Sequence, residues 1–318
     1  MAVNNFKPFA TGNGANVTSQ ADYEALASLI SGFQSGKASS AQINKALRQS
    51  TVMASVLAQF ISDSAATDVL DDGNPATILA NLKAGMTALT PGRLLNVQVL
   101  TGSGTYVPSS GTKKIVVEAT GAGGGAGGAS AGGRSGDNYI YSVGGGGGAG
   151  AYAKFTMDSG FSNLTYSCGK GGLGGNKTGA PNSQGSAGGQ TTFGTVLTLQ
   201  GGGGGTSGTT NDGFSVGCAA GGGFGANTVN LSGSAKSVLG FGGSVGAPGY
   251  MINANGGNAG VGANSFLGYG GFGASNGPGG EARGFGSGGG GALTIQSNTS
   301  SQAGGNGGDG LIIVWEYA

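Results

Sequence analysis

Apolar side chains in the first hundred residues recur every three or four positions, which is the spacing of one face of an α-helix. Ser19 is a suitable N-cap for a first helix, because its hydroxyl can accept a hydrogen bond from a free backbone N–H of the first turn. The apolar members of this run are Tyr23, Leu26, Ile30 and Phe33. Asn74 and Pro75 predict the start of a later helix that extends to about Lys83, and residues 85–95 are predicted to form a linker.

The longest predicted helix follows Ser39 and Ser40. Its apolar face is formed by Ile43, Leu47, Val52, Met53, Val56, Leu57, Phe60 and Ile61. The spacing alternates between three and four residues, as in helical bundles between subunits, and packing within one chain explains it equally well. The candidate oligomerisation residues are therefore Ile43, Leu47, Met53, Leu57, Phe60 and Ile61.

From residue 96 the period of the pattern changes to two, which is typical of β-strands. Val97 and Val99 alternate with polar or smaller neighbours, and Ile115 and Val117 do the same after a turn. Further strands are predicted at 151–157, 163–168, 195–200 and 311–317. The last of these is apolar enough to be a central strand covered on both faces. Because strands lie near both ends of this half, we expect its two ends to meet.

Composition separates the two halves, since 76 of the 318 residues are glycine and all but seven of these follow residue 100. The glycine-dense stretches are 121–150, 169–190, 201–225, 240–291 and 304–310. Glycine does not recur strictly at every third position, which excludes collagen, while the composition alone would also suit disordered segments.

Glycine loses more backbone entropy on folding than any other residue, so ordered glycine stretches need many compensating interactions. Extended left-handed helices of three residues per turn would supply them, because without side chains they pack closely and form hydrogen bonds laterally between backbones. We therefore predict polyglycine-II-like helices, both parallel and antiparallel, beside a small β-sandwich. Aromatic residues between the glycine runs are expected at the turns.

Charge and terminal patterns narrow the class of protein. The net charge is +1 without a basic run, so nucleic acid is not an expected partner. The N-terminus has no charged start followed by an apolar stretch, and we expect neither a secretion signal nor membrane insertion. The protein is expected to stay in a cytosol until release, and Cys168 and Cys218 are expected to be buried thiols, with a disulfide formed after release as the alternative.

The residue types of common enzymes are scarce. The chain has no histidine, which removes the commonest general base and metal ligand, and no metal or cofactor is expected. We expect the protein not to be an enzyme. A polysaccharide depolymerase with paired carboxylates is the alternative, but the glycine-rich half carries only Glu118, Asp137, Asp158, Asp212, Glu281, Asp309 and Glu316. Matches to G-x-G-x-x-G, as at Gly121 to Gly128, are expected by chance in so glycine-rich a sequence.

Aromatic residues within the glycine-rich stretches are the candidate recognition residues. They are Tyr139, Tyr141, Phe214, Phe224, Phe241, Tyr250, Phe266, Tyr269, Phe272 and Phe285. Aromatic side chains on loops of a rigid scaffold offer large contact area at small entropic cost. Filling the gaps between glycine helices is the alternative role, although we expect several of the set to be exposed.

The N-terminal stretch resembles a known protein family. Residues 4–85, which begin NNFKPFATGNG and end DVLDDGNPATILANLKAG, are similar to the N-terminal module of tail fibre proteins from tailed bacteriophages and prophages of Gram-negative bacteria. The resemblance implies attachment to the phage tail tip or baseplate and assembly as a homotrimer. Phe6 and Phe9 are the candidate attachment residues.

The second half resembles the glycine-rich C-terminal domain of phage fibres and adhesins. The resemblance rests on VQVLTGSGTYVPSSGTKKIVVEATGAGGGAGG, on the hairpin GAYAKFTMDSGFSNLTYSCGKGGLGG and on the final GDGLIIVWEYA. It implies packed polyglycine helices and loops at one end that bind bacterial outer-membrane proteins. Leu100 stands where the family often has an aromatic residue, and the chain has no long shaft between its modules.

Together these patterns predict a multi-domain protein, α-helical and then β. Residues 1–36 are predicted to attach to the tail, 37–95 to form a helical oligomerisation region with a linker, and 96–318 to form the receptor-binding tip. The expected function is adsorption of a virion, assembled in the host cytoplasm, to an outer-membrane protein or surface glycan. A purely structural tail component without receptor contact is the remaining alternative.

Overall fold

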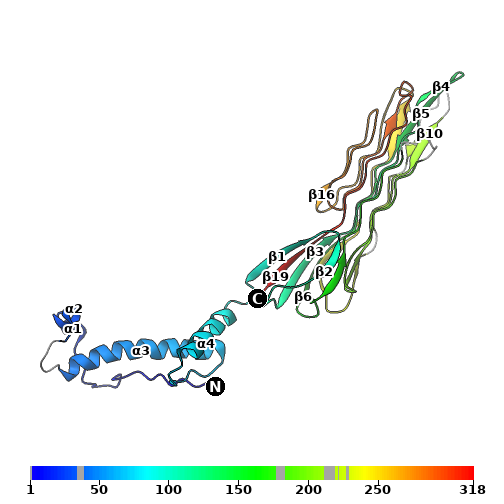
Figure 1. Cartoon of the computed structure of the whole chain (residues 1–318). Helices are drawn as coiled ribbons and strands as arrows, with labels where there is room; N and C mark the ends of the chain where they lie inside the picture. Colours follow the sequence, from blue (N-terminus) through cyan, green and yellow to red (C-terminus); the bar gives the residue numbers. More distant parts are fainter. Residues whose placement is uncertain (1, 34–38, 177–182, 211–218, 221, 227–228) are drawn as a thin grey trace. The chain divides into compact units, whose positions relative to one another are not determined.

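The fold was obtained as a computed structural model, which describes residues 2–33, 39–176, 183–210, 219–220, 222–226 and 229–318. The chain divides into two compact units, Met1–Arg93 and Leu94–Ala318 (Figure 1). The first is helical and the second consists of antiparallel sheets and glycine-rich segments, so the predicted order of a helical part followed by a β-rich part is confirmed.

The first unit contains α1 (Gln20–Glu24), α2 (Ser28–Ser31), α3 (Ser40–Ala65) and α4 (Pro75–Ala88). The predicted caps are confirmed: Ser19 Oγ accepts from the backbone N–H of Asp22, and Asn74 Oδ1 accepts from those of Ala76 and Thr77. The first predicted helix is instead two short ones, and neither has a buried residue to stabilise a longer run.

A small core holds the first unit together. It consists of Ala58, Ile61 and Val69, with Phe6, Ile78 and Leu82 packed against it. The N-terminal segment lies along α3, because the backbone N–H of Val69 donates to Val3, Asn5 donates to Val69, and Phe9 donates to Thr51 Oγ1. The predicted attachment and helical segments thus form one unit, which ends at Arg93. The predicted linker 85–95 is too long, because α4 continues to Ala88 and β1 begins at Leu94. Among the helices that the structure describes, none has the length and apolar character needed to cross a membrane.

Two five-stranded antiparallel sheets face each other in the second unit. The first has the order β1 (Leu94–Leu100), β19 (Leu311–Tyr317), β3 (Lys114–Thr120), β6 (Tyr152–Met157) and β13 (Lys236–Phe241). The second has the order β12 (Val229–Leu231), β9 (Leu197–Leu199), β8 (Thr191–Phe193), β7 (Leu164–Ser167) and β2 (Ser103–Tyr106). Strand β19 lies between β1 and β3, which confirms that the two ends of this half meet.

One core lies between the two sheets because alternate residues of their strands point inward. Its members include Tyr106, Ile115, Val117, Phe155, Met157, Phe193, Leu197, Leu199, Ile312 and Val314. Figure 1 places the first sheet at one end of the second unit, which we call the sheet end.

Shorter strands form the opposite end, which we call the distal end (Figure 1). One sheet there has the order β10 (Ser207–Thr210), β5 (Asn138–Gly144) and β18 (Leu293–Thr294), with β4 (Gly133–Ser135) also paired to β5. Another has the order β11 (Ala219–Ala220), β14 (Gly249–Asn253) and β15 (Gly256–Asn258). A second core joins them through Tyr141, Val143, Met251, Ala259 and Leu293. A hairpin of β16 (Gly268–Tyr269) and β17 (Arg283–Gly284) lies apart from both sheets.

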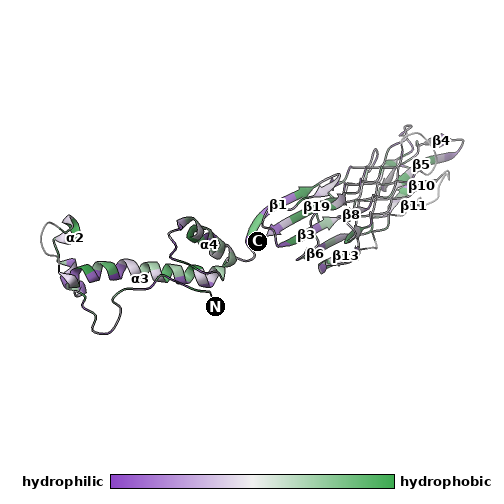
Figure 2. Ribbon diagram, turned by 60° about the horizontal axis from the view of Figure 1, so that its bottom comes forward, coloured by the Kyte–Doolittle hydropathy of each residue, from purple (hydrophilic) through white to green (hydrophobic). Residues whose placement is uncertain are grey.

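Glycine segments run side by side between the two ends (Figures 1 and 2). Their backbone hydrogen bonds repeat every three residues: Gly121, Gly124 and Gly127 donate to Ala151, Gly148 and Gly145 of one neighbour. The residue after each of these glycines donates to segment 183–189, and the next residue donates to segment 302–308, so each neighbour is reached once in every three residues.

Segment 121–129 also accepts hydrogen bonds from three further segments, 172–175, 202–205 and 289–292. Within the part of the chain that the structure describes, it therefore has six hydrogen-bonded neighbouring segments. The segments to which it donates run antiparallel to it, and those from which it accepts run parallel. Nearly every backbone polar group is thus satisfied without side chains, which offsets the entropy lost by ordering glycine.

Steric fit explains why glycine is required in these segments. A Cβ atom added at Gly124 would lie 2.0 Å from the carbonyl oxygen of Gly203, and one added at Gly147 would lie 2.0 Å from that of Gly124. Both contacts are with backbone, which cannot rotate away as a side chain can. A methyl group is accommodated only at particular positions, such as Ala122, Ala126 and Ala149, all of which are fully buried.

Candidate functional site

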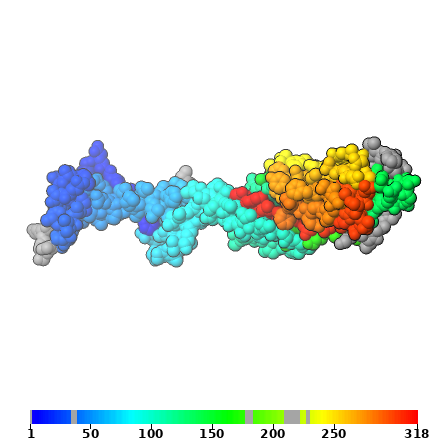
Figure 3. Space-filling model, turned by 90° about the horizontal axis from the view of Figure 1, so that it is seen from above, coloured from blue at the N-terminus to red at the C-terminus, as the bar shows by residue number. Residues whose placement is uncertain are grey.

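The distal end of the second unit carries a cluster of exposed polar and aromatic side chains. Segments that are far apart in the sequence meet there, as the green, yellow and orange-red surfaces of the space-filling view show (Figure 3). The exposed residues include Arg134, Asp137, Asn138, Tyr250, Ile252, Asn253, Asn255 and Asn276. Tyrosine, asparagine and arginine on loops are the composition that binding surfaces of immune receptors use, because they combine contact area with adaptable hydrogen bonding.

Side-chain contacts between separate loops hold the distal surface in place. Gln296 Nε2 donates to Asn255 Oδ1 at 2.6 Å, and Asn298 Nδ2 donates to Asn276 Oδ1 at 2.9 Å. Within the β14–β15 hairpin, Asn258 Nδ2 donates to the hydroxyl of Tyr250 at 3.2 Å. These bonds leave less conformational freedom to lose when a partner binds.

The tip of the β4–β5 hairpin adds the exposed ion pair of Arg134 and Asp137, 3.5 Å apart. The Arg134 guanidinium also lies 5.4 Å from the centre of the Tyr139 ring. Both charges of this tip are solvent-exposed and worth little to stability.

The predicted recognition aromatics do not form one site. Tyr139 and Tyr250 lie at the distal end, where Tyr250 is half exposed. Tyr141 lies there too but is 2% exposed within the distal core, so its prediction as a surface residue is wrong. Its alternation with Tyr139 and Val143 is a strand pattern that would have placed it in a core.

Four of the predicted aromatics lie at the sheet end instead. They are Phe241, Phe266, Tyr269 and Phe285, all exposed. Phe241 pairs with Tyr152 of the first sheet, and the hairpin that bears Tyr269 and Phe285 is anchored by bonds from Gly150 to Gly286 and from Gly286 to Asp309. Phe224 and Phe272 are exposed part-way along the glycine segments, and Phe214 lies outside the described residues.

Sequence reasoning named Tyr250 but missed the other exposed residues of the asparagine-rich β14–β15 hairpin. Its exposed members Ile252, Asn253 and Asn255 stand beside Tyr250. The signal available was the stretch MINANGGN, which joins two glycine segments and is dense in asparagine.

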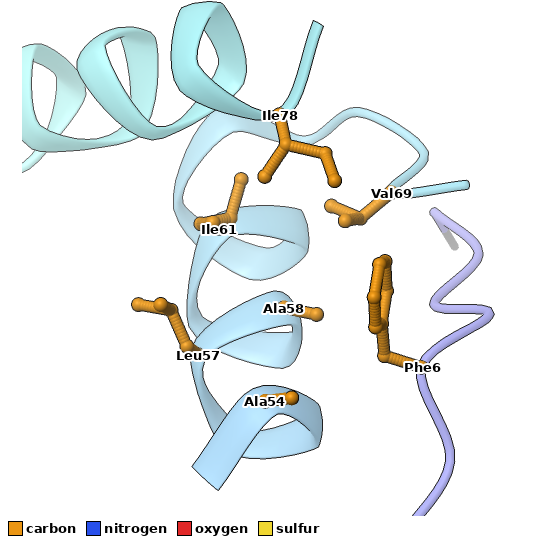
Figure 4. Close-up of a pocket in the computed structure, with 7 residues that line it drawn as sticks. All are labelled: Phe6, Ala54, Leu57, Ala58, Ile61, Val69 and Ile78. Carbon is orange, nitrogen blue, oxygen red and sulfur yellow. The ribbon is translucent and has the colours of Figure 1, made fainter. Parts of the chain in front are cut away.

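In the first unit the predicted attachment residues differ in their surroundings. Phe6 points into an apolar pocket of about 130 Å³ that Ala58, Val69 and Ile78 help to line (Figure 4). It therefore packs within its own chain, whereas Phe9 is exposed.

The predicted oligomerisation face of α3 is mostly exposed. Figure 2 shows apolar residues at intervals along the helix, and the exposed ones are Ile43, Leu47, Met53, Val56, Leu57 and Phe60. Ile61 is 1% exposed in the core of the unit, so its assignment to a face between subunits is wrong. Ile78 and Leu82 of α4 pack against the core that contains Ile61.

The described carboxylates of the second unit are engaged in structural contacts. Asp137, Asp158 and Asp309 form ion pairs with Arg134, Lys236 and Lys170, and Glu281 accepts from the backbone of Asn306. Glu118 accepts from the Tyr152 hydroxyl at 2.9 Å and lies 3.7 Å from Lys154. Asp212 lies outside the described residues.

Glu316 is fully buried between the sheets. The Tyr106 hydroxyl donates to it at 2.7 Å, Gln98 Nε2 at 2.8 Å and the Ser109 backbone at 3.2 Å. Burial alone would raise the pKa of Glu316, but the hydrogen bonds from Ser109, Tyr106 and Gln98 outweigh it and hold the pKa below its ordinary value. Burial raises the pKa of Tyr106 far above its usual range, and the hydrogen bond to Glu316 and the charge of that carboxylate raise it further.

Cys168 is a buried, free thiol whose Sγ donates to the carbonyl of Leu100. Burial raises its pKa to about 11, which disfavours the reactive thiolate. Cys218 lies outside the described residues. In the part of the chain that the structure describes, no three potential metal ligands come together.

Comparison with known proteins identifies the second unit. A sequence search among curated proteins gave no significant match. A family model described as a glycine-rich domain matches residues 98–317, which span both sheets and all the glycine segments between them. The chain therefore belongs to the family of proteins that carry this glycine-rich domain.

Proposed function

We propose that the chain is an adhesin of the bacteriophage tail-fibre type, whose second unit binds a bacterial surface receptor through its distal loops. The observation that carries the proposal is the combination at the distal end of exposed Tyr250, Ile252 and asparagine side chains with a scaffold hydrogen-bonded along its whole length. The first unit would attach the protein to the tail, and the virion would be its final location. The receptor would be an outer-membrane protein or a surface glycan.

We interpret the glycine segments as polyglycine-II-like helices. The three-residue period of their hydrogen bonds and the six neighbours of segment 121–129 support this interpretation, because three residues per turn direct successive N–H groups toward three neighbours. Such an array would hold short loops rigidly, so that binding costs little ordering entropy.

The exposed apolar stripe of α3 supports the proposal that the chain forms a homotrimer. Met53 and Val56 are the most exposed of its large apolar residues, at 70% and 61%. Four further apolar residues of the stripe, Ile43, Leu47, Leu57 and Phe60, are also exposed, and exposed apolar surface of this kind marks an interaction site. Several copies of the tip would raise avidity for a repeated receptor.

A binding role fits the second unit better than catalysis. The described carboxylates there are each held by a partner of the same chain, whereas glycoside hydrolysis needs two that face a substrate. The exposed distal residues are instead aromatic and amide side chains, which recognise without reacting.

Adsorption of the labelled full-length protein to a panel of Gram-negative strains tests the proposal. The test variant combines Tyr250→Ala and Ile252→Ala, and the control is Phe224→Ala, an aromatic residue part-way along the glycine segments that is more exposed than either. We expect the double variant to lose at least about tenfold in affinity, since two central contact residues are removed, while the control binds normally.

Equal loss in both variants would locate recognition on the sides of the unit rather than at its distal end. If the wild-type protein binds to no strain although the intact phage adsorbs, the chain is a structural tail component without receptor contact.

A further inference from the structure

A cavity of about 230 Å³ opens where the first β-sheet meets the glycine segments, at the end of the unit opposite the distal loops. Strands β6 and β13, which contribute to it, lie side by side at the sheet end (Figure 2). Aromatic rings of Tyr152, Phe241 and Phe266 form one part of its wall, and Ser244, Asn264 and Ser265 form another. The remaining wall is glycine backbone, which lets a ligand approach closely.

The three rings form a connected cluster. The centre of the Tyr152 ring lies 5.1 Å from that of Phe241 and 4.3 Å from that of Phe266, and the two phenylalanine rings are 5.9 Å apart. Tyr152 is buried, while Phe241 and Phe266 remain 41% and 58% exposed. Large aromatic surface is thus left open to water around a concave site, where a bound ring would cover it.

Hydrogen bonds fix the groups around the cavity. The Tyr152 hydroxyl donates to Glu118, which also pairs with Lys154. Asn264 Oδ1 accepts from the backbone of Gly270 at 2.8 Å, which orients the amide and leaves its NH₂ group to donate. Ser265 Oγ accepts from the backbone of Leu267 at 3.1 Å. The site is therefore formed before any ligand binds.

The chemistry of the lining selects the class of ligand. None of the nine described residues that line the cavity is charged, so neither a phosphate nor a cation would find a counter-charge there. A pyranose ring has a face of C–H bonds that packs on aromatic rings and a rim of hydroxyls that bond to amides and hydroxyls. The cavity is smaller than the range of about 300–1,000 Å³ typical of larger ligands, which fits one sugar ring.

From this geometry we propose that the cavity binds one neutral sugar unit of a surface polysaccharide. This site is separate from the distal loops, and its existence does not depend on the tail-fibre proposal. An uncharged aromatic side chain of a partner protein is the competing occupant, and the experiment below distinguishes the two.

Saturation-transfer NMR on the full-length protein with glucose, galactose and N-acetylglucosamine, each offered separately, is the direct test. Phe266→Ala removes an exposed ring of the wall, and Ser244→Phe fills the mouth of the cavity while leaving the rings in place. Tyr250→Ala at the distal end is the matched control. We expect transfer to one face of at least one sugar, a loss of affinity of about tenfold or more in the two cavity variants, and no change in the control.

The proposal is wrong if no sugar receives saturation at millimolar concentration, or if transfer persists in both cavity variants. It is also wrong if Tyr250→Ala abolishes the signal, because the sugar then binds at the distal end. Because the Phe266 side chain is exposed, Phe266→Ala is expected to fold. If Phe266→Ala does not fold, Ser244→Phe still tests the cavity. Binding of another tail protein that is lost in Phe266→Ala, without any sugar binding, would make the cavity a protein contact.

Discussion

Gly147 offers a direct test of the close packing between glycine segments. It lies in the middle of segment 144–151, and a Cβ atom there would be 2.0 Å from the carbonyl oxygen and 2.7 Å from the carbonyl carbon of Gly124. Gly147→Ala must therefore push two backbones apart by about an ångström or more, because the neighbouring atoms have no rotamer to change.

The cost follows from what that displacement breaks. The N–H of Gly147 donates to Gly289 at 2.8 Å, and the N–H of Gly124 donates to Gly148 at 2.9 Å. Overpacking costs about 1–3 kcal/mol, and each buried backbone group left without a partner costs about 1–3 kcal/mol more. We expect Gly147→Ala to lower the free energy of unfolding of the second unit by about 3–6 kcal/mol.

Urea unfolding, monitored by tryptophan fluorescence, measures the free energy of unfolding of the second unit. The only tryptophan, Trp315, lies in β19 and therefore reports on that unit alone. The control is Gly133→Ala in β4, where an added Cβ meets nothing within 4 Å and the backbone conformation is ordinary. That variant should change the free energy of unfolding by less than about 1 kcal/mol. Equal midpoints for the two variants would refute the argument that these segments exclude side chains.

Three further outcomes are expected. The hydrogen bonds that hold the pKa of Glu316 below its ordinary value of 4.5 stabilise the fold above that pH and are lost as pH falls through the lower folded value. The urea midpoint should therefore fall below about pH 4.5, and less steeply in Glu316→Gln; identical slopes would contradict the assignment. Met53→Glu should convert the proposed trimer into monomers, as measured by ultracentrifugation, without a change in helicity by circular dichroism. An oligomeric state that does not change would contradict a contact between subunits through α3. In a Cys218→Ser background, Cys168 should react with a thiol reagent at pH 8 only on unfolding; rapid reaction of the folded protein would show that it is accessible.

The periodic parts of the fold follow from the sequence. The two-residue alternation around Ile115 and the apolar run 311–317 predicted strands that the structure contains, and the cap residues Ser19 and Asn74 marked two helix starts. These features are local, because each depends on a few neighbouring side chains that must face either the core or water.

The arrangement of the glycine segments is not predictable in the same way. The sequence around Gly124 has no side chain that could specify its neighbours. In the structure its N–H donates to Gly148, and Gly203 lies against its Cα. For the same reason the exposed aromatics could not be assigned to one end in advance, since Tyr250 and Phe266 both stand in glycine-rich surroundings and lie at opposite ends of the unit.

The three-residue period of the backbone hydrogen bonds limits how this domain can change length. Insertion of one or two residues into segment 121–129 would turn every later N–H group toward the wrong neighbour, whereas insertion of three would restore each to its own. Adjacent segments would have to lengthen together to keep their partners. The distal loops lie outside that repeat, so they are free to differ in length and composition while the segments that carry them are not.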